Sequence, residues 1–124
     1  MIIGVGTDLL EVSRVKKTLN KQVSFRESVF TSNEINYCEG KKYKDRHYAA
    51  RFAAKEAFMK ALGIGWRYGI SFTEIEIEND DLGKPKLCLK GKAKKKADEL
   101  GVKEIHVSLS HLKDLACAYV IITK

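Results

Sequence analysis

The sequence has no long apolar run, and its cysteines are few and scattered. No stretch approaches the roughly 18 consecutive apolar residues that indicate a membrane-spanning helix. The three cysteines, Cys38, Cys88 and Cys117, are odd in number and far apart, so they indicate neither a disulfide framework nor a zinc site. The opening stretch is interrupted by Asp8 and Glu11 too early for a signal peptide. We therefore expect a reduced, cytoplasmic protein.

Complete nucleotide-binding glycine motifs are also missing. Gly4 and Gly6 could begin a G-x-G-x-x-G motif, but Leu9 occupies the position of the third glycine. No Walker lysine follows these glycines. Both the Rossmann and the P-loop classes are therefore excluded.

The composition that remains is globular, with an excess of positive charge. A length of 124 residues, 44% of them hydrophobic and 31% charged, predicts a single domain spanning residues 1–124. The net charge of +7 favours anionic partners. One candidate is a small basic nucleic-acid-binding module, which the seven lysines between Lys84 and Lys96 would suit. Basic residues are spread over several segments, however, and no aromatic stacking motif is present, so we expect no nucleic-acid partner.

Hydrophobic periodicity predicts an α+β fold, in which a small, mainly antiparallel sheet packs against one long helix. The expected strands are residues 2–7, 72–79, 86–90, 104–111 and 115–122. The expected helices are residues 9–21, one or two short helices within 24–38 with an N-cap at Thr31 or Ser32, the long helix 45–62 and a lysine-rich helix within 90–101.

Side-chain periodicity also predicts which residues face the core. Leu9, Val12, Val15 and Leu19 occur at helical spacing and are expected to pack inward. In the strand 72–79, alternation places Thr73, Ile75 and Ile77 inside and Glu74, Glu76 and Glu78 outside. In the lysine-rich helix, Ala93, Ala97 and Leu100 form the expected packing side.

Asp8 ends the first predicted strand, on the same face as Gly4 and Gly6. A glycine face leaves room for something bulky to lie against it. The spacing favours Asp8 as the N-cap of the next helix, with Glu11 completing a capping box. A metal ligand is the other interpretation that the position allows.

The long helix carries charges on several sides. Its apolar residues occur nearly all round, which is typical of a buried helix, and buried charges need partners. Glu56 and Lys60 could form an ordinary surface pair. Arg51 and Lys55 are four residues apart and repel each other, unless an anion lies between them. His111 ends the predicted strand 104–111, where a lone histidine is more often a turn residue than a ligand.

Four segments together resemble the bacterial holo-acyl-carrier-protein synthases, which are small 4′-phosphopantetheinyl transferases. They are GVGTDLLEVSRV at 4–15, RFAAKEAFMKALG at 51–63, GKP at 83–85 and HVSLSH at 106–111. The resemblance implies the 4′-phosphopantetheinyl transferase fold. It also implies transfer of the 4′-phosphopantetheine arm of coenzyme A to a serine of apo-acyl carrier protein, for fatty acid biosynthesis. The by-product is adenosine 3′,5′-bisphosphate.

The resemblance further implies a magnesium-dependent active site. Asp8 and Glu56 are the implied Mg²⁺ ligands, and Mg²⁺ is typically held by one or two carboxylates together with substrate phosphates. Lys60 is implied to stabilise charge on the diphosphate or its leaving group. The base that deprotonates the serine is left open between Asp8, Glu56 and a water on the metal.

Substrate and partner contacts follow from the same resemblance. The implied coenzyme A contacts are Arg51, Lys55, Gly63, Gly83, Pro85 and His111. Arg14, Lys17, Lys21 and Arg26 form a basic row that could dock the acidic carrier protein. Family members form trimers with active sites between neighbouring subunits, so we expect a homotrimer.

Overall fold

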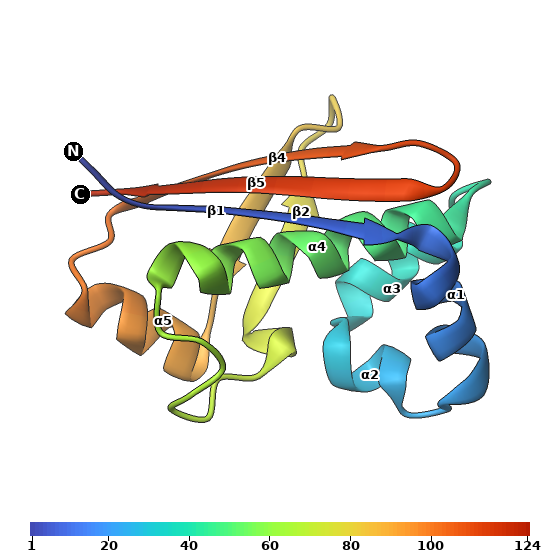
Figure 1. Ribbon diagram of the computed structural model, residues 1–124, viewed down its shortest axis with the longest axis horizontal. Helices are drawn as coiled ribbons and strands as arrows, with labels where there is room; N and C mark the ends of the chain where they lie inside the picture. Colours follow the sequence, from blue (N-terminus) through green and yellow to red (C-terminus); the bar gives the residue numbers. More distant parts are fainter.

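One long helix crosses a three-stranded antiparallel sheet in the computed structural model, which describes residues 1–124 (Figure 1). The sheet has the order β1-β5-β4, formed by β1 (Ile2–Glu11), β5 (Leu115–Thr123) and β4 (Glu104–His111). The helix is α4 (Lys44–Leu62). This arrangement confirms the expected α+β fold with a small antiparallel sheet packed on a long helix.

Two glycines allow α4 to approach β1 closely. A Cβ atom at Gly4 or Gly6 would overlap the backbone of Ala61 or Ala57 on the helix. The bulky neighbour expected against the glycine face is therefore the protein's own long helix. The helix ends at Gly63, which has φ of 75° and donates its N–H to the Met59 carbonyl oxygen at 3.2 Å.

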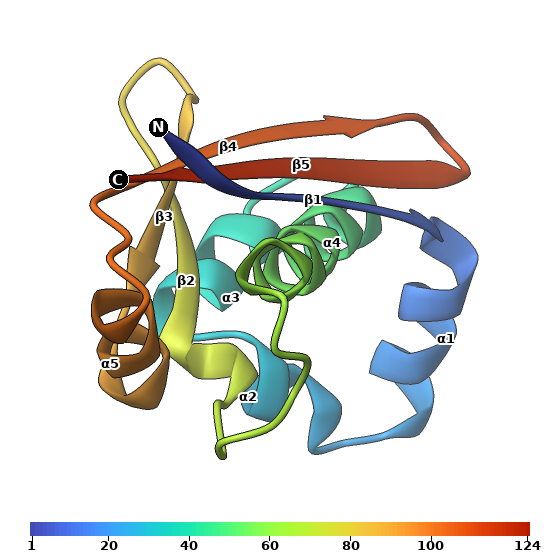
Figure 2. The same ribbon diagram turned by 60° about the vertical axis from the view of Figure 1, so that its left-hand side comes forward.

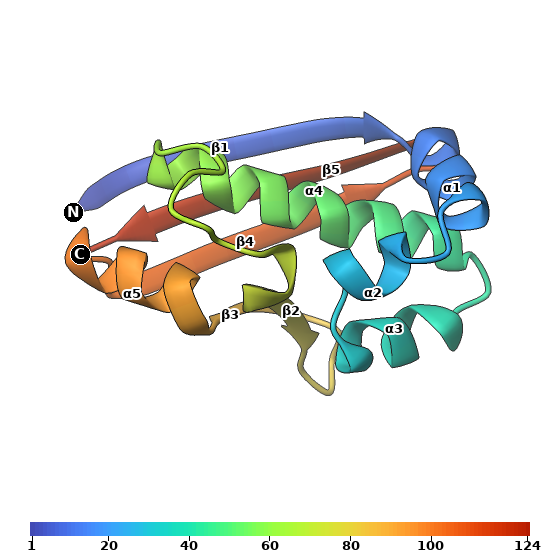
Figure 3. The ribbon, with the colours of Figure 1, turned by 90° about the horizontal axis from the view of Figure 1, so that it is seen from below.

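A second layer lies on the other side of α4 from β1 (Figure 3). The 3-10 turn η1 (Phe72–Glu74) leads into a separate two-stranded sheet of β2 (Ile75–Asn79) and β3 (Pro85–Leu89), which is followed by α5 (Gly91–Glu99). Figure 2 shows α4 beneath the three-stranded sheet, with β2 beside it and the β2–β3 hairpin reaching β4. Enclosure on both sides explains why α4 is apolar nearly all round.

Three short helices complete the end of the molecule near the C-terminus of β1. They are α1 (Val12–Lys21), α2 (Phe25–Val29) and α3 (Ser32–Glu39). Thr31 caps α3 in a capping box with Glu34, which confirms one of the two predicted caps. The inward faces of α1 and α3 pack with the first turns of α4 in one apolar cluster.

Three predicted side-chain orientations are wrong. Leu9 belongs to β1 rather than α1, because β1 pairs with β5 as far as Glu11, and it is 65% exposed on the outer sheet face. Glu76 is buried, since it accepts a hydrogen bond from Thr31 of the neighbouring segment. Leu100 lies beyond the end of α5 and is exposed.

None of the helices combines the length and the apolar character that a membrane-spanning helix needs.

Candidate active site

Asp8 lies inside β1, opposite Ala118 of β5. Its Oδ1 accepts a hydrogen bond from the Lys60 ammonium at 3.1 Å, and the same ammonium donates to the Thr7 carbonyl oxygen at 3.0 Å. The prediction that Asp8 caps the following helix is wrong, because β1 continues past it and the N-cap residue of α1 is Glu11. The Glu11 side chain makes no capping hydrogen bond either.

Glu56 lies on α4, one turn before Lys60. Its Oε2 accepts a hydrogen bond from the indole Nε1 of Trp66 at 3.2 Å. Lys60 pairs with Asp8 rather than with Glu56, so the expected intrahelical surface pair is replaced by a contact between α4 and β1. The carboxylate of Glu56 is thereby left facing a pocket.

Asp8 and Glu56 line the same open pocket, of about 330 Å³, between β1, α1, α2 and α4. Its apolar walls come from Leu10, Val15, Phe25 and Phe52, and Arg14 contributes a guanidinium. Two carboxylates from elements far apart in the sequence thus converge on one cavity, next to an exposed ammonium. This donor set fits Mg²⁺, which prefers oxygen ligands and needs only one or two carboxylates when substrate phosphates complete its coordination.

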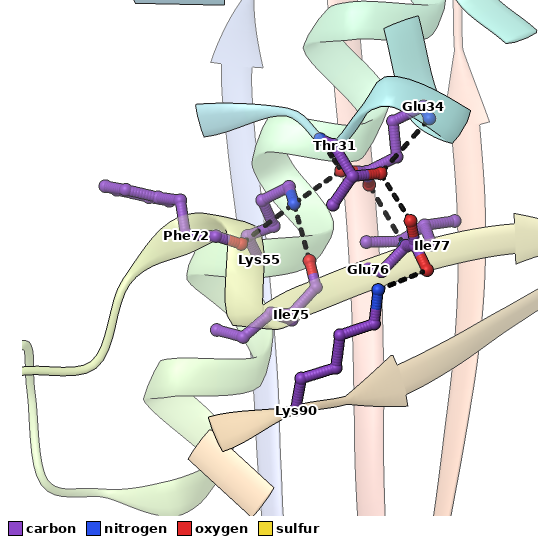
Figure 4. Close-up of polar contacts among 8 residues, drawn as sticks. All are labelled: Thr31, Glu34, Lys55, Phe72, Ile75, Glu76, Ile77 and Lys90. Carbon is purple, nitrogen blue, oxygen red and sulfur yellow. Dashed lines mark hydrogen bonds and ion pairs between the residues drawn. The ribbon is translucent and has the colours of Figure 1, made fainter. Parts of the chain in front are cut away.

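Lys55, adjacent to Glu56 in the sequence, lies in a closed environment (Figure 4). Its ammonium donates to Glu34 Oε1 at 2.8 Å, to the Phe72 carbonyl oxygen at 2.9 Å and to the Ile75 carbonyl oxygen. The side chain is 0% exposed, and three acceptors engage its three donors. This contradicts the expected contact with a coenzyme A phosphate, because no donor and no access remain for one.

Glu34 is the residue that resolves the charge conflict on α4, and sequence reasoning missed it. One carboxylate oxygen accepts from Lys55 and from the Thr31 N–H, and the other accepts from the Ile77 N–H at 3.0 Å. Burial lowers the pKa of Lys55, and the adjacent Glu34 carboxylate partly opposes that shift. The spacing from Thr31 to Glu34 in the sequence indicates a capping box. It does not reveal that Glu34 also pairs with Lys55, 21 residues away.

Glu76 extends the same network towards the surface. It accepts from the Thr31 hydroxyl and lies 3.3 Å from the Lys90 ammonium (Figure 4). Burial raises its pKa, but the Thr31 hydrogen bond and Lys90 outweigh burial, so its pKa lies below its usual value. Lys90, one of the seven clustered lysines, therefore has a structural partner.

Arg51 lies on the β2 side of α4. Its guanidinium donates to Asn79 Oδ1 and lies 4.0 Å from the centre of the Tyr37 ring. Asn79 in turn donates to the Gly83 carbonyl oxygen at 2.9 Å and pairs with Pro85 across the β2–β3 sheet. Three of the predicted coenzyme A contacts, Arg51, Gly83 and Pro85, are thus connected through Asn79, a residue that the sequence did not single out.

His111 is connected to that group through aromatic rings, because His47 lies between it and the Tyr37 ring over which Arg51 stacks, whereas Gly63 lies apart. His111 ends β4 beside His47 of α4, with ring centres 5.0 Å apart, and its Nδ1 is buried without a hydrogen-bond partner. Burial, followed by the neighbouring His111, lowers the pKa of His47 to about 4. Gly63 is at the C-terminus of α4. The predicted site residues therefore do not form one cavity within a single chain.

The four residues of the predicted basic row also differ in their surroundings. Arg14, Lys17 and Lys21 are exposed along α1, as expected. Arg26 on α2 lies 3.9 Å from Glu39 and stacks over the Tyr48 ring, so it differs from the free cations on α1.

Comparison with known proteins places this chain and its fold in one family. Residues 4–120 match the family model of the 4′-phosphopantetheinyl transferase superfamily. The chain belongs to this superfamily, because the match covers nearly its whole length.

Named relatives agree over full-length alignments. The holo-[acyl-carrier-protein] synthase of Geotalea daltonii is 46% identical over 100% of both chains, and that of Ruminiclostridium cellulolyticum is 52% identical over 96% of this chain and 90% of the relative. The crystal structure of the holo-[acyl-carrier-protein] synthase of Neisseria meningitidis superposes with a TM-score of 0.90 at 34% identity, covering 100% of both chains. A Bacillus anthracis holo-(acyl-carrier-protein) synthase in complex with CoA (3′,5′-ADP) superposes with a TM-score of 0.81 at 40% identity, covering 98% of this chain and 96% of that one.

Proposed function

We propose that this protein transfers the 4′-phosphopantetheine arm of coenzyme A to a serine hydroxyl of apo-acyl carrier protein, as a holo-acyl-carrier-protein synthase of fatty acid biosynthesis. The products are holo-acyl carrier protein and adenosine 3′,5′-bisphosphate. The observation that carries the proposal is the convergence of Asp8 and Glu56 on one pocket, with Lys60 against Asp8. The names of full-length relatives support the same reaction.

The chemistry is attack by an alcohol on a diphosphate, in which positioning and charge neutralisation dominate. Lys60 is suited to neutralise the diphosphate, because its ammonium is exposed at the edge of the site and its contact with Asp8 directs it there. Asp8 and Glu56 are the residues that would hold Mg²⁺, and the ion, when bound, supplies further charge stabilisation.

The coenzyme A contacts are best explained by an assembly of subunits. Asp8, Glu56 and Lys60 belong to the β1 side of α4, whereas Arg51 and the Gly83–Pro85 turn are connected to Asn79 of β2. Figure 3 shows β1 and β2 on different sides of α4. We infer that a neighbouring subunit brings the second group to the first in a homotrimer. Arg51, Gly63, Gly83, Pro85 and His111 stay proposed contacts of the nucleotide and its phosphates.

The outer sheet face supports such an assembly. Val5 is 48% exposed, Leu9 65% and Tyr119 48%, and all three lie on the face turned away from α4. Leu9 follows Asp8 directly, so a subunit packed on this face would border the pocket. Analytical ultracentrifugation of Leu9→Glu tests this, and we expect a monomer with little activity. A trimeric Leu9→Glu would remove this face from the interface.

The carrier protein is proposed to dock on α1. Arg14 lines the pocket that contains Asp8 and Glu56, and Lys17 and Lys21 continue from it along the exposed side of the helix. Acyl carrier proteins are acidic, and complementary charge steers such a partner to the site. Arg26 is proposed as a secondary contact, since Glu39 already pairs with it.

We propose that residues 1–124 act as one transferase domain, which the family match over residues 4–120 supports. A cytoplasmic location is proposed on the basis of the three free cysteines.

The reaction is tested by mass spectrometry of the carrier protein. The enzyme is incubated with coenzyme A and apo-acyl carrier protein, with Mg²⁺ in one arm and a chelator in the other. We expect the carrier to gain one phosphopantetheine, and only in the Mg²⁺ arm. No gain, together with tight and salt-sensitive binding of nucleic acid, would favour the basic nucleic-acid-binding module instead.

A further inference from the structure

Trp66 is the only tryptophan of the chain, and its indole N–H points at a proposed metal ligand. Nε1 donates to Oε2 of Glu56 at 3.2 Å, across the loop that joins α4 to η1. This is the one side-chain hydrogen bond that the Glu56 carboxylate makes in the structure. Oε1 is therefore left without a side-chain partner, at a pocket that Asp8 also lines.

The course of the loop explains how Trp66 comes back over α4. Gly63 and Gly65 have φ of 75° and 66°, a left-handed conformation that favours glycine. A Cβ at either position would meet nothing within 4 Å, so the glycines are needed for chain direction and not for space. The two turns reverse the chain at the end of α4 and direct the indole towards Glu56.

The indole ring is held in place from the other side by a stack of aromatic rings. Its centre lies 4.1 Å from that of Phe72, which stacks in turn on Phe52 at 5.5 Å. Phe52 is one turn before Glu56 on α4 and lines the same pocket, so the stack connects Trp66 to the pocket wall. Further along the loop, the Lys96 ammonium lies 4.0 Å from the centre of the Tyr68 ring.

We propose that Trp66 is a positioning residue that orients Glu56 for the metal ion. Its N–H occupies one carboxylate oxygen, which leaves the other for the ion shared with Asp8. Hydrogen bonds to a metal-ligating carboxylate from neighbouring groups fix its orientation, and their removal typically weakens metal binding. This inference rests on the proposed function, because it takes Glu56 to be a metal ligand.

The test measures binding of Mn²⁺ to the enzyme loaded with coenzyme A and without carrier protein, by electron paramagnetic resonance of the free ion. Trp66→Phe keeps the ring stack and removes only the N–H. We expect it to raise the Kd for Mn²⁺ by about 10-fold. Tyr68→Phe is the matched control, since it removes a hydroxyl from the same loop and should leave the Kd unchanged. Equal weakening by both variants would indicate loop disruption and overturn the proposal.

Glu56→Ala separates this proposal from the proposed function. If Glu56→Ala weakens Mn²⁺ binding while Trp66→Phe binds as the wild type does, the positioning role is wrong and the Glu56 assignment stands. If Glu56→Ala binds Mn²⁺ normally, the metal assignment and the positioning role both fail.

Fluorescence provides a second readout that a packing role would not produce. The emission of the single tryptophan should shift when Mg²⁺ is added to the coenzyme A-loaded wild type, and it should not shift in Glu56→Gln. A shift of equal size in Glu56→Gln would overturn the proposal.

Discussion

Two neighbouring residues in the middle of α4, Lys55 and Glu56, lie in opposite surroundings. Lys55 is fully buried, and its ammonium has a carboxylate and two carbonyl oxygens as partners. Glu56 faces an open pocket, with one indole N–H as its side-chain partner. Both are charged residues of one helix, yet the first joins α4 to α3 and β2, and the second is available to a ligand.

The difference lies in how completely each charge is satisfied. A buried charge persists in a fold only when it is paired and hydrogen-bonded, and then it has no capacity left for a substrate. A charge at a cavity with open coordination positions is where a metal or a phosphate can bind. We therefore expect substitutions on the Lys55 side to change stability, and substitutions on the Glu56 side to change turnover.

The largest expected effect is on the buried side. Lys55→Met leaves the Glu34 carboxylate buried without its cation, which should lower the free energy of unfolding by about 3–5 kcal/mol. Chemical denaturation measures this loss. Lys60→Met is the matched control on the open side, where an exposed pair contributes at most about 1 kcal/mol. Equal losses for both lysines would remove the distinction between the two regions.

Lys60→Met should instead reduce catalysis. Removing a cation that acts on developing charge typically lowers turnover about 100-fold, and the affinity for coenzyme A should change less. Steady-state kinetics together with calorimetric binding of coenzyme A separates the two effects. An equal loss in binding and in kcat/KM, with kcat unchanged, would make Lys60 a binding residue only.

Substitution of His47, like substitution of Lys55, is expected to change stability. Its pKa of about 4 in the folded protein is below the value near 6.5 that is usual for histidine, because burial and then His111 disfavour its charged form. Between those pH values the unfolded state binds more protons, so this group lowers stability as pH falls from about 6.5 to 4, by about 1–3 kcal/mol. The loss should be smaller in His47→Gln, as denaturation at several pH values would show. Parallel stability–pH curves would contradict the assignment.

The smallest expected effect concerns α1. The double reversal Arg14→Glu with Lys17→Glu should raise the KM for the carrier protein several-fold and flatten its salt dependence, because exposed charges act mainly on encounter. The affinity for coenzyme A should barely change. Unchanged carrier kinetics across a salt titration would move the docking surface elsewhere, with the lysines between Lys84 and Lys96 the next to test.

Local signals in the sequence were sufficient to predict most of the helices and strands. The long helix and its stop at Gly63 are confirmed, as is the cap at Thr31, because both depend on residues within one turn. The position of Asp8 was not predictable in this way. Its spacing fits a capping box, and only pairing with β5, more than 100 residues away, keeps β1 extended as far as Glu11.

The same limit applies to the site. The sequence does not show which of the two neighbouring charges, Lys55 or Glu56, is buried and paired. The partner of Lys55 lies on a different helix. The contact between Trp66 and Glu56 depends on a chain reversal that glycine spacing permits but does not specify. Residue types at the site could thus be predicted, whereas the division between satisfied and available charges required the three-dimensional contacts.

If the open carboxylates of Asp8 and Glu56 are required for the transfer, Asp8→Asn should abolish most of the activity. Asparagine is nearly isosteric with aspartate and Asp8 lies within β1, so the substitution keeps the strand and removes the carboxylate charge. Wild type and variant are incubated with coenzyme A, Mg²⁺ and apo-acyl carrier protein, and the carrier is weighed over time by mass spectrometry. We expect a phosphopantetheine mass gain with the wild type and a rate at least about 100-fold lower with a stably folded Asp8→Asn. A near-normal rate for Asp8→Asn would contradict this role of the carboxylates.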